Sequence, residues 1–322
     1  MARFVAGRLL FAAILIVASS SAALFLTRLA PGDVTSELGP NATDAEVAIA
    51  RERFDLDHGV VEQWGLWASR VLRLDFGQSF LYGRPVAPLV GRAAANTAAL
   101  GLTALLVSTA LGLSLGIFTG SRRGGVAAAL VRGASIACVS MPPLLTSLIL
   151  IFLAARTGWL PLGGMTSSDA VDQSWGAWMA DVARHLPLPV LALSLPIAAT
   201  FERLQSQSMD DAMQQPFLTA ARARGVAPRA LILQHAWPVS LRPICAVYGL
   251  VIGALLSGSF VVEYITAWPG LGRLMYEALR ARDIYLVAGC AAMGACFLAL
   301  GTLIGDLLLA MVDPQMREGT AG

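Results

Sequence analysis

Six runs of about twenty mostly apolar residues divide this sequence, and they limit its possible folds more than any other feature. A helix needs about 20 apolar residues to cross a bilayer. Of the 322 residues, 56% are hydrophobic and 14% are charged, whereas soluble domains are about 45–50% apolar and about 25% charged. The chain has too few polar groups to cover a soluble globule, which predicts an all-α, polytopic membrane protein with six transmembrane helices. The predicted spans are Leu9–Leu29, Thr97–Phe118, Ala134–Ala155, Leu186–Leu204, Pro243–Val262 and Tyr285–Met311.

The distribution of arginine orients these spans. The Lys+Arg count is 23, and every one of these residues is arginine. Because cytoplasmic loops carry an excess of basic residues, the arginine-rich segments after the second and fourth spans predict that both termini lie in the cytoplasm, with the first span kept as an uncleaved helix. We expect three regions: residues 1–30 with the first span, an external segment 31–96 with short amphipathic helices, and a core 97–322 that carries a cytoplasmic loop at 206–242.

The external segment carries two helix patterns. The sequence TDAE at Thr43–Glu46 is typical of a capping box, so a short helix should follow it and end near Phe54. Apolar residues then recur at helical spacing from Val60 to Leu74 and predict a second amphipathic helix. The pair is either a small cap packed on the bundle or a docking surface for an external partner, and the spacing favours the cap.

Residues that the chain lacks disfavour several functions. Ion-coupled carriers usually place carboxylates inside their spans, whereas Glu202, Glu263 and Asp306 lie towards predicted span ends. A P-loop needs a lysine, so an ATP-driven transporter built on this chain would need a separate ATPase. The histidines and cysteines form no metal or catalytic pattern, and a net charge of +2 gives no nucleic-acid footprint. We therefore expect no catalytic residue, no metal site, no cofactor and no nucleic-acid partner for this chain.

A compact basic stretch, TAARARGVAPRALILQHAWP at Thr219–Pro238, interrupts the apolar pattern. Helix should run up to Gly225, with a break near Pro216, because glycine tolerates the left-handed conformation that ends helices. Pro228 suits the first turn of the next helix. The alanines at 220, 221 and 223 form a narrow surface that another backbone can approach closely. Spacing alone leaves two interpretations even: a solvated basic loop, or a rigid knob that inserts into a cleft of a partner.

Short motifs follow one another along nearly the whole chain. They are APGD at Ala30–Asp33, LDFGQS at Leu74–Ser79, GRPV at Gly83–Val86, WLP at Trp159–Pro161, HLPLPVLAL at His185–Leu193, FVVEYITAWPGLGRL at Phe260–Leu274, RDIYLVAG at Arg282–Gly289 and DP at Asp313–Pro314. In this order and spacing they resemble the permeases of the peptide/nickel importer family of ABC transporters. The stretch TAARARG, followed after nine residues by HAWP, is similar to the EAA motif of such inner-membrane permeases.

This resemblance implies a six-helix permease bundle in the bacterial cytoplasmic (inner) membrane, with the EAA-like loop as a coupling helix that docks in a groove of a cytoplasmic ATPase. The implied partners are a second, similar permease, two ABC ATPase subunits or domains that bind ATP and Mg²⁺, and an extracytoplasmic solute-binding protein. The chain would then translocate di- or oligopeptides by alternating access and would not be an enzyme. The residues that the resemblance assigns to ATPase coupling are Thr219, Ala220, Ala221, Arg222, Arg224, Gly225 and His235.

Some positions depart from the family's pattern. Thr219 stands at the position of the EAA glutamate, and Ser206 stands where a second arginine usually follows Arg203. Pro238 and Val239 occupy positions where the family usually has arginine and asparagine. These departures bear on individual contacts of the loop and leave its implied role unchanged.

Two further sets of residues are candidates for moving parts. Pro142 and Pro143 interrupt the third span, where a kink is favoured over a hinge. Glu263 either caps a helix end or lines an external gate. Pro269, Gly270 and Gly272 are typical of a turn, and the resemblance places that turn in a re-entrant external loop near the gate.

Other functions stay open as alternatives. Nickel or another small solute is the alternative substrate within the same family. A stand-alone secondary carrier or channel is the alternative from a different class, and it would be favoured by carboxylates paired across spans or by an inverted repeat, neither of which the sequence contains. The EAA-like loop argues against a membrane scaffold that transports nothing.

Overall fold

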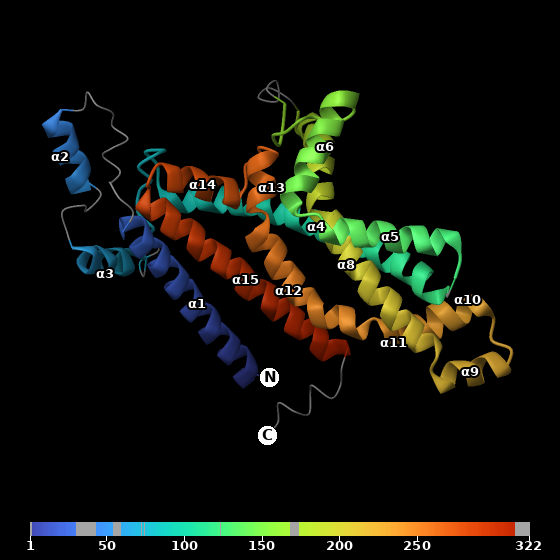
Figure 1. Ribbon diagram of the computed structural model, residues 1–322. Coiled ribbons are helices and arrows are strands. Elements are labelled where there is room, and N and C mark those ends of the chain that lie inside the picture. Colours follow the sequence, from blue (N-terminus) through green and yellow to red (C-terminus); the bar gives the residue numbers. More distant parts are fainter. Residues whose placement is uncertain are drawn as a thin grey trace. The chain divides into compact units, whose positions relative to one another are not determined.

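The computed structural model describes residues 2–29, 43–53, 59–71, 73, 75–122, 124–167 and 174–312. Helices hold most of these residues (Figure 1), and the β-pairing among them is an isolated bridge between Gln78 and Pro85. The motifs at 30–33 and 313–314 lie outside the described residues. The helices are α1 (Ala2–Leu29), α2 (Asp44–Arg53), α3 (Val60–Val71), α4 (Val86–Ser121), α5 (Val126–Ser140), α6 (Pro143–Thr157), α7 (Trp175–His185), α8 (Pro187–Met213), α9 (Pro216–Ala223), α10 (Pro228–Ala230), the π-helix η3 (Leu231–Ala236), α11 (Trp237–Ser240), α12 (Arg242–Gly258), α13 (Phe260–Ile265), α14 (Leu271–Arg280) and α15 (Ile284–Val312).

Five helices of the described chain are long and apolar enough to cross a membrane, and a sixth span is added if the bent pair α5–α6 counts as one. The five are α1, α4, α8, α12 continued into α13, and α15. The all-α class of the prediction is thereby confirmed. The helices also run past the predicted ends of the spans: α4 has 36 residues, and at 1.5 Å per residue it is much longer than the roughly 30 Å hydrocarbon core of a bilayer.

The predicted third span, Ala134–Ala155, is not a continuous helix. The axes of α5 and α6 differ by 109°. Met141 and Pro142 have extended backbones, with ψ of 119° and 145°, because a residue that precedes proline avoids the helical region. Pro143 then starts α6 at a position where its missing N–H costs nothing. The two prolines therefore break the helix. The prediction of a simple kink underestimated the change in helix direction.

Contacts along the chain define two compact units, and each is described by itself. The first unit holds Ala99–Trp268 and the chain from Leu300 onwards. Helix α8 is central in it, in contact with α5, α6, α7, α11, α12 and α13. The apolar window of α8 is 56% buried, against 11% for α1 in the other unit. The core of the first unit contains Leu100, Leu105, Val190, Leu193, Ile252, Leu255 and Trp268.

The second unit holds Ala2–Ala98 and Pro269–Ala299. Both helices predicted for the external segment are present as α2 and α3, but only α3 has distinct apolar and polar faces. Helix α3 buries Gln63 and Trp67, and Trp64 donates a hydrogen bond from Nε1 to Ser21 Oγ of α1 at 2.8 Å. Helix α3 therefore packs against a span, as expected for the cap interpretation; this leaves docking of an external partner untested.

Candidate functional site

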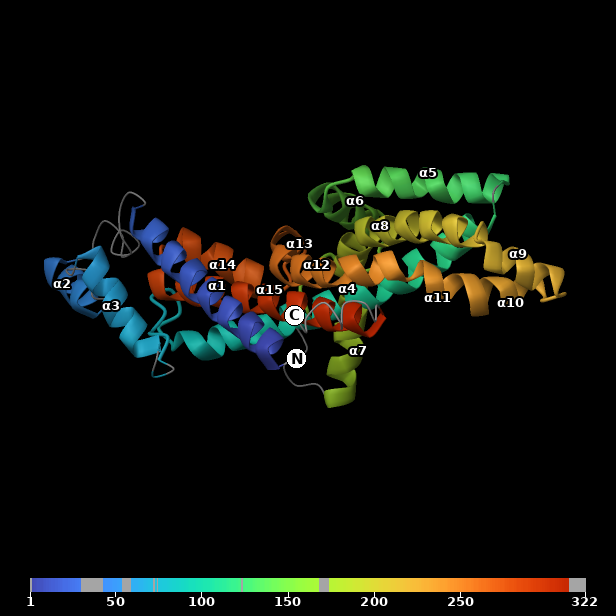
Figure 2. The ribbon, with the colours of Figure 1, turned by 90° about the horizontal axis from the view of Figure 1, so that it is seen from below.

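The basic stretch forms a short helix pair at the end of α8. Figures 1 and 2 both show α9 and α10 beyond the last turn of α8. The chain leaves α8 at Gln214, and α9 begins with Pro216 in its first turn, at the predicted break. The inner face of α9 packs Leu218 and Ala221 into an apolar cluster. The other buried members of this cluster are Met209 and Ala212 of α8 and Leu231 and Ala236 of η3.

Gly225 ends α9 in the left-handed conformation, with φ of +83°. The Gly225 N–H donates to the Arg222 carbonyl at 3.0 Å, and the Val226 N–H donates to the Ala221 carbonyl at 3.3 Å. These two bonds are those of a Schellman motif, and the predicted glycine cap is confirmed. A Cβ atom at Gly225 would meet nothing within 4 Å. The turn therefore needs glycine for its backbone dihedral and not for space.

The chain after the turn is also held by proline. Pro228 starts α10 as predicted, and η3 leads into α11 with Pro238 in its first turn. Because Pro238 has no N–H and its ring would clash with a carbonyl one turn earlier, the backbone widens here: the Trp237 N–H donates to the carbonyl of Ile232, five residues back. Short π-helical segments of this kind often occur at functional sites. His235 lies in this segment, with Nδ1 3.3 Å from the Ala230 carbonyl oxygen.

The structure gathers the residues assigned to coupling into this one segment and separates them by burial. Ala221 is 0% exposed, so it supports the packing of α9 and offers nothing to a partner. His235 is half-buried. The exposed members of the set are Thr219, Ala220, Arg222, Arg224 and Gly225. Ala223 and Arg229 are exposed as well, so the outer surface of the helix pair combines small side chains with three arginines.

The two proline residues proposed as a hinge lie at the break between α5 and α6. The hydroxyl of Thr146 donates to the Pro142 carbonyl at 3.3 Å, and that of Ser147 donates to the Pro143 carbonyl at 2.7 Å. The Pro142 carbonyl also accepts the Thr146 N–H at 3.1 Å, so these hydroxyls are additional donors to the first turn of α6, as is common for Ser and Thr in helices.

Glu263, proposed to cap a helix or line a gate, is buried in α13. Its side chain is 0% exposed, and Oε1 accepts a hydrogen bond from Ser259 Oγ at 2.6 Å. Its carbonyl accepts the N–H of Trp268 at 2.8 Å, and the Ala267 N–H donates to the Tyr264 carbonyl at 3.2 Å. Ala267 has φ of 53°, so α13 also closes with a Schellman pattern. In this state Glu263 belongs to the interior of the first unit.

Pro269, Gly270 and Gly272 lie in the second unit, where they lead into α14. The Pro269 carbonyl accepts a hydrogen bond from Asn96 Nδ2 at 2.9 Å. Gly270 precedes the helix in an extended conformation, and the Leu271 N–H donates to Thr97 Oγ1 at 2.7 Å. The predicted turn is thus the N-terminal cap of α14, fixed by two side chains of α4, with Gly272 in the first turn of the helix.

A family comparison decides what kind of protein carries this arrangement. The family of binding-protein-dependent transport system inner membrane components matches residues 112–318, a segment that includes the coupling set, the proline break and the predicted gate. The chain belongs to this family. It is a multi-pass inner-membrane permease of the ABC transporter class.

Curated relatives of the permease match along almost their full length. A "probable peptide ABC transporter permease protein" of Sinorhizobium fredii is 32% identical over 294 residues, which are 91% of this chain and 92% of that protein. The oligopeptide transport system permease protein OppB of Mycobacterium tuberculosis is 28% identical over 324 residues, covering 98% and 99% of the two chains. AppB of Bacillus subtilis, with the same description, is 27% identical over 320 residues, covering 98% and 100%.

A solved structure supports the fold of the permease. The MetNI methionine ABC transporter in an inward-facing conformation matches with a TM-score of 0.52 and 17% identity, over 70% of this chain and 96% of that chain. At this identity the likeness shows the fold alone.

Helices α4 and α8 approach each other closely at three glycines of α4. The sequence analysis did not single out these glycines. A Cβ atom at Gly112 would lie 2.5 Å from Phe201 Cβ, and one at Gly116 would lie 2.5 Å from Gln205 Cβ. Gly120 lies against the Ser206 carbonyl in the same way. These glycines are spaced four residues apart, and small residues at this spacing let membrane helices approach closely. Their spacing could have predicted the contact from the sequence.

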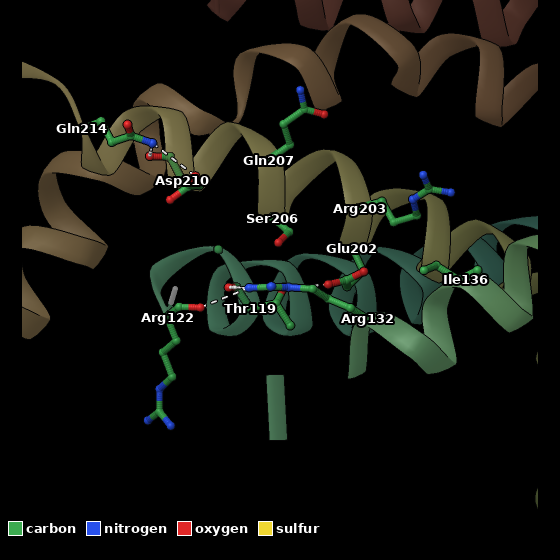
Figure 3. A pocket seen from close by; sticks show the side chains of 11 residues that line it. Thr119, Arg122, Arg132, Ile136, Glu202, Arg203, Ser206, Gln207, Asp210 and Gln214 are labelled. Atoms are coloured by element: carbon green, nitrogen blue, oxygen red, sulfur yellow. Dashed lines mark hydrogen bonds between the residues drawn. The ribbon is translucent and has the colours of Figure 1, made fainter. Parts of the chain in front are cut away.

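The same end of α4 and α8 carries a polar pocket of about 630 Å³ (Figure 3). Thr119 Oγ1 donates to Glu202 Oε1 at 2.6 Å. Arg132 of α5 donates from Nη2 to the Thr119 carbonyl at 2.8 Å and to the Arg122 carbonyl at 3.1 Å. The Arg122 side chain extends away from the others in Figure 3, and its guanidinium lies 4.6 Å from the centre of the Phe118 ring. The sequence interpretation had placed Glu202 only near a span end and gave it no partner.

In the second unit, Asp283 ties the entry of α15 to the segment before α4. Its carboxylate accepts hydrogen bonds from Ser79 Oγ at 2.6 Å, from the Leu81 N–H at 3.1 Å and from the Leu286 N–H at 3.2 Å. Burial raises the pKa of Asp283 above its ordinary value, and these hydrogen bonds offset part of the shift. Nearby, burial and a hydrogen bond to Glu277 raise the pKa of Tyr82 to about 12.

Proposed function

We propose that the permease is one membrane subunit of an ATP-driven importer that takes up di- or oligopeptides delivered by an external solute-binding protein. The family is named for binding-protein-dependent transport. The relatives from Sinorhizobium, Mycobacterium and Bacillus are named as peptide or oligopeptide permeases. The near-complete coverage of both chains in each comparison supports carrying that substrate class to this permease.

The exposed helix pair α9–α10 carries the mechanistic part of the proposal. Leu218 and Ala221 fix α9 to the end of α8, and the Schellman turn at Gly225 sets the direction in which the chain leaves α9. The small exposed side chains of Ala220 and Ala223 let a partner backbone come close, while the three arginines suit acidic groups around a cleft. A push on α9 is therefore transmitted to α8, the central helix of its unit.

In the proposed assembly this helix pair faces the cytoplasm, together with both termini. The arginine bias of the loops supports that orientation. The assembly also contains a second permease and two ABC ATPase subunits, which hold ATP and Mg²⁺. Closure of the ATPases on ATP would move the coupling helices and open the pathway outwards to the binding protein. The permease supplies the path and no chemistry on the peptide.

Site-specific cross-linking tests the docking surface. Ala220→Cys places a thiol on the exposed face of α9, and we expect it to cross-link to a co-expressed P-loop ATPase through a short bifunctional maleimide. Ala177→Cys is the matched control, because Ala177 is an exposed helical alanine on α7, which the arginine bias assigns to the external side. Equal labelling of the ATPase by both variants, or by neither, would contradict the assignment of α9 as the docking helix.

Uptake by reconstituted vesicles tests the substrate class. Vesicles that contain the purified assembly and its binding protein should accumulate a radiolabelled dipeptide such as Ala-Ala only when ATP is present. Uptake of Ni²⁺ in place of the dipeptide would move the assignment to the alternative substrate of the family. Dipeptide uptake by the permease alone, driven by an ion gradient, would support a secondary carrier instead.

A further inference from the structure

The polar pocket between α4, α5 and α8 is separate from the coupling surface. None of the seven residues assigned to coupling lines it, and its walls come from the last turns of α4, from α5 and from the second half of α8. Its volume of about 630 Å³ lies within the roughly 300–1,000 Å³ of typical ligand sites. Every residue that lines it belongs to the first unit.

Glu202 gives the pocket an unsatisfied acceptor. Its side chain is 1% exposed. Oε1 accepts the hydroxyl of Thr119, whereas Oε2 is buried and has no hydrogen-bond partner in the described chain. A buried carboxylate oxygen without a donor costs free energy, so native structures usually supply one from protein, water or ligand. The described chain itself supplies no donor to Oε2, so a water or a ligand in the pocket can supply one.

Arginines supply the opposite charge in the same pocket. A guanidinium has five N–H donors, on Nε, Nη1 and Nη2. The hydrogen bonds of Arg132 to the Thr119 and Arg122 carbonyls both use Nη2, so neither of these two bonds uses Nε or Nη1. These bonds fix the Arg132 side chain to the end of α4. Arg203, one residue after Glu202 on α8, also lines the pocket and is exposed. An anionic group can therefore meet arginine donors close to the unpartnered acceptor.

The mixture of charges selects the class of ligand. A multiply charged anion such as a free phosphate would meet the carboxylates of Glu202 and Asp210, which share the pocket. A simple cation would meet the arginines. We propose that this pocket binds a small zwitterion, whose primary ammonium group donates to Glu202 Oε2 and whose anionic group accepts from Arg132.

Two sources of this chemistry exist near a membrane. One is a short peptide, with an α-ammonium and a carboxylate; this source rests on the proposed function. The other is the headgroup of phosphatidylethanolamine, with a primary ammonium and a phosphate; this source does not depend on peptide transport. In either case the ligand bridges α5 and α8 about three turns before the end of α8.

Chemical variants of a dipeptide test the peptide source. The full-length permease, with the subunits that co-purify with it, is placed in nanodiscs of phosphatidylglycerol, which has no ammonium group. Binding of radiolabelled Ala-Ala is measured without ATP, together with N-acetyl-Ala-Ala and Ala-Ala amide as competitors. We expect Glu202→Gln to weaken Ala-Ala binding by about tenfold or more, because a charged hydrogen bond is lost. N-acetylation should weaken binding to the wild type similarly and add little in Glu202→Gln, since partners in one interaction are not additive.

A second pair of changes tests the anionic end. Arg132→Gln and carboxyl amidation should each weaken binding, again without adding to one another. Glu62→Gln is the matched control for Glu202→Gln, because Glu62 lies exposed on α3 and undergoes the same chemical change. Thermal unfolding without ligand checks that each variant is folded.

Lipid headgroups provide the other arm. Dihexanoyl phosphatidylethanolamine should raise the unfolding temperature of the wild type and not of Glu202→Gln. Dihexanoyl phosphatidylcholine, which lacks N–H donors, should raise neither. A response to this lipid together with no dipeptide binding supports the zwitterion site with the lipid as its source. If neither probe depends on Glu202, the proposal is overturned.

Peptide uptake, measured in parallel, separates this inference from the proposed function. Normal uptake with no binding that depends on Glu202 refutes the pocket alone. Absence of uptake refutes the peptide function. The unfolding experiment with dihexanoyl phosphatidylethanolamine then decides whether the pocket binds a zwitterion.

Discussion

The turn that ends α9 at Gly225 (the proposed coupling turn) and the turns that end α13 and α14 have the same backbone pattern but different residues. At the end of α9 the left-handed residue is Gly225, with φ of +83°. At the ends of α13 and α14 it is Ala267 and Arg282, each with φ of 53°. The α14 closure has the same two bonds as the others, from Asp283 to the Ala278 carbonyl at 2.9 Å and from Arg282 to the Leu279 carbonyl at 3.2 Å.

The three turns differ in the burial of the residue next to the left-handed one. Ala267 is followed by Trp268, which is 0% exposed, and Arg282 by Asp283, which is 1% exposed. Val226, after Gly225, is only half-buried. A left-handed residue with a Cβ costs roughly 1–2 kcal/mol, and the burial of a large or multiply bonded neighbour can offset that cost. At the end of α9 the glycine backbone itself holds the geometry, because the half-buried Val226 supplies less packing than Trp268 or Asp283 does.

The largest effect should follow from changing the coupling turn. Gly225→Val places a β-branched residue in the left-handed region, and a cost of roughly 1–2 kcal/mol would lower the ratio of the left-handed turn to other conformations about tenfold. We expect peptide uptake and peptide-stimulated ATPase activity of the reconstituted assembly to fall by a similar factor. Membrane insertion and yield should stay near the wild type, since a Cβ there meets nothing.

Gly176→Val is the control for this experiment. Gly176 lies in α7 with ordinary φ, and its Cβ would also meet open space. That variant should keep its uptake. Wild-type uptake in Gly225→Val as well would show that the left-handed turn is not needed for coupling.

A smaller effect, on stability, should follow from removing the buried neighbour at the end of α14. Asp283→Ala leaves the Ser79 hydroxyl and two backbone N–H groups without their acceptor, which should lower the free energy of unfolding by about 2–3 kcal/mol. Thermal unfolding of the purified permease in detergent measures this loss. Asp44→Ala, on the exposed surface of α2, should change little.

The loss should depend on pH in a defined direction. The folded pKa of Asp283 is raised by burial, so its contribution to stability is fully present below its ordinary value of 3.8 and declines as pH rises through the folded value. The gap between wild type and Asp283→Ala should therefore narrow from pH 4 to pH 7. A gap that widened over this range would mean that the hydrogen bonds to the carboxylate outweigh its burial.

Local signals in the sequence predicted the features that depend on local rules. Apolar runs located the spans because a bilayer demands a minimum helix length. Gly225 and Pro228 marked the coupling turn because each residue suits one backbone conformation at a helix end. A capping pattern predicted α2, and apolar residues at helical spacing predicted α3.

Features that depend on distant partners were not predictable in this way. No local sequence signal predicts a left-handed residue at Ala267 or Arg282. The residues that follow them, Trp268 and Asp283, are buried by distant parts of the chain. Asp283 accepts a hydrogen bond from a residue 204 positions away. The burial of Ala221 depends on how η3 packs against α9. The two prolines predict that the helix is interrupted, but they do not predict the angle of 109°. The glycines at 112, 116 and 120 are the exception, since their spacing was visible and was not used.

The smallest expected effect is a gain in stability, from replacing the left-handed alanine at the end of α13 by glycine. Ala267→Gly removes the left-handed cost of roughly 1–2 kcal/mol and adds back about 0.5–1 kcal/mol of backbone entropy in the unfolded chain, so the free energy of unfolding should rise by about 0.5–1 kcal/mol. Gly225→Ala is its mirror image, with the same dihedral region and open space around the Cβ, and it should lose a similar amount. Thermal unfolding of both variants under one set of conditions measures the pair. If Ala267→Gly were instead destabilising, the packing of the Ala267 methyl group would outweigh the backbone strain, and that packing would have to explain why this helix end dispenses with glycine.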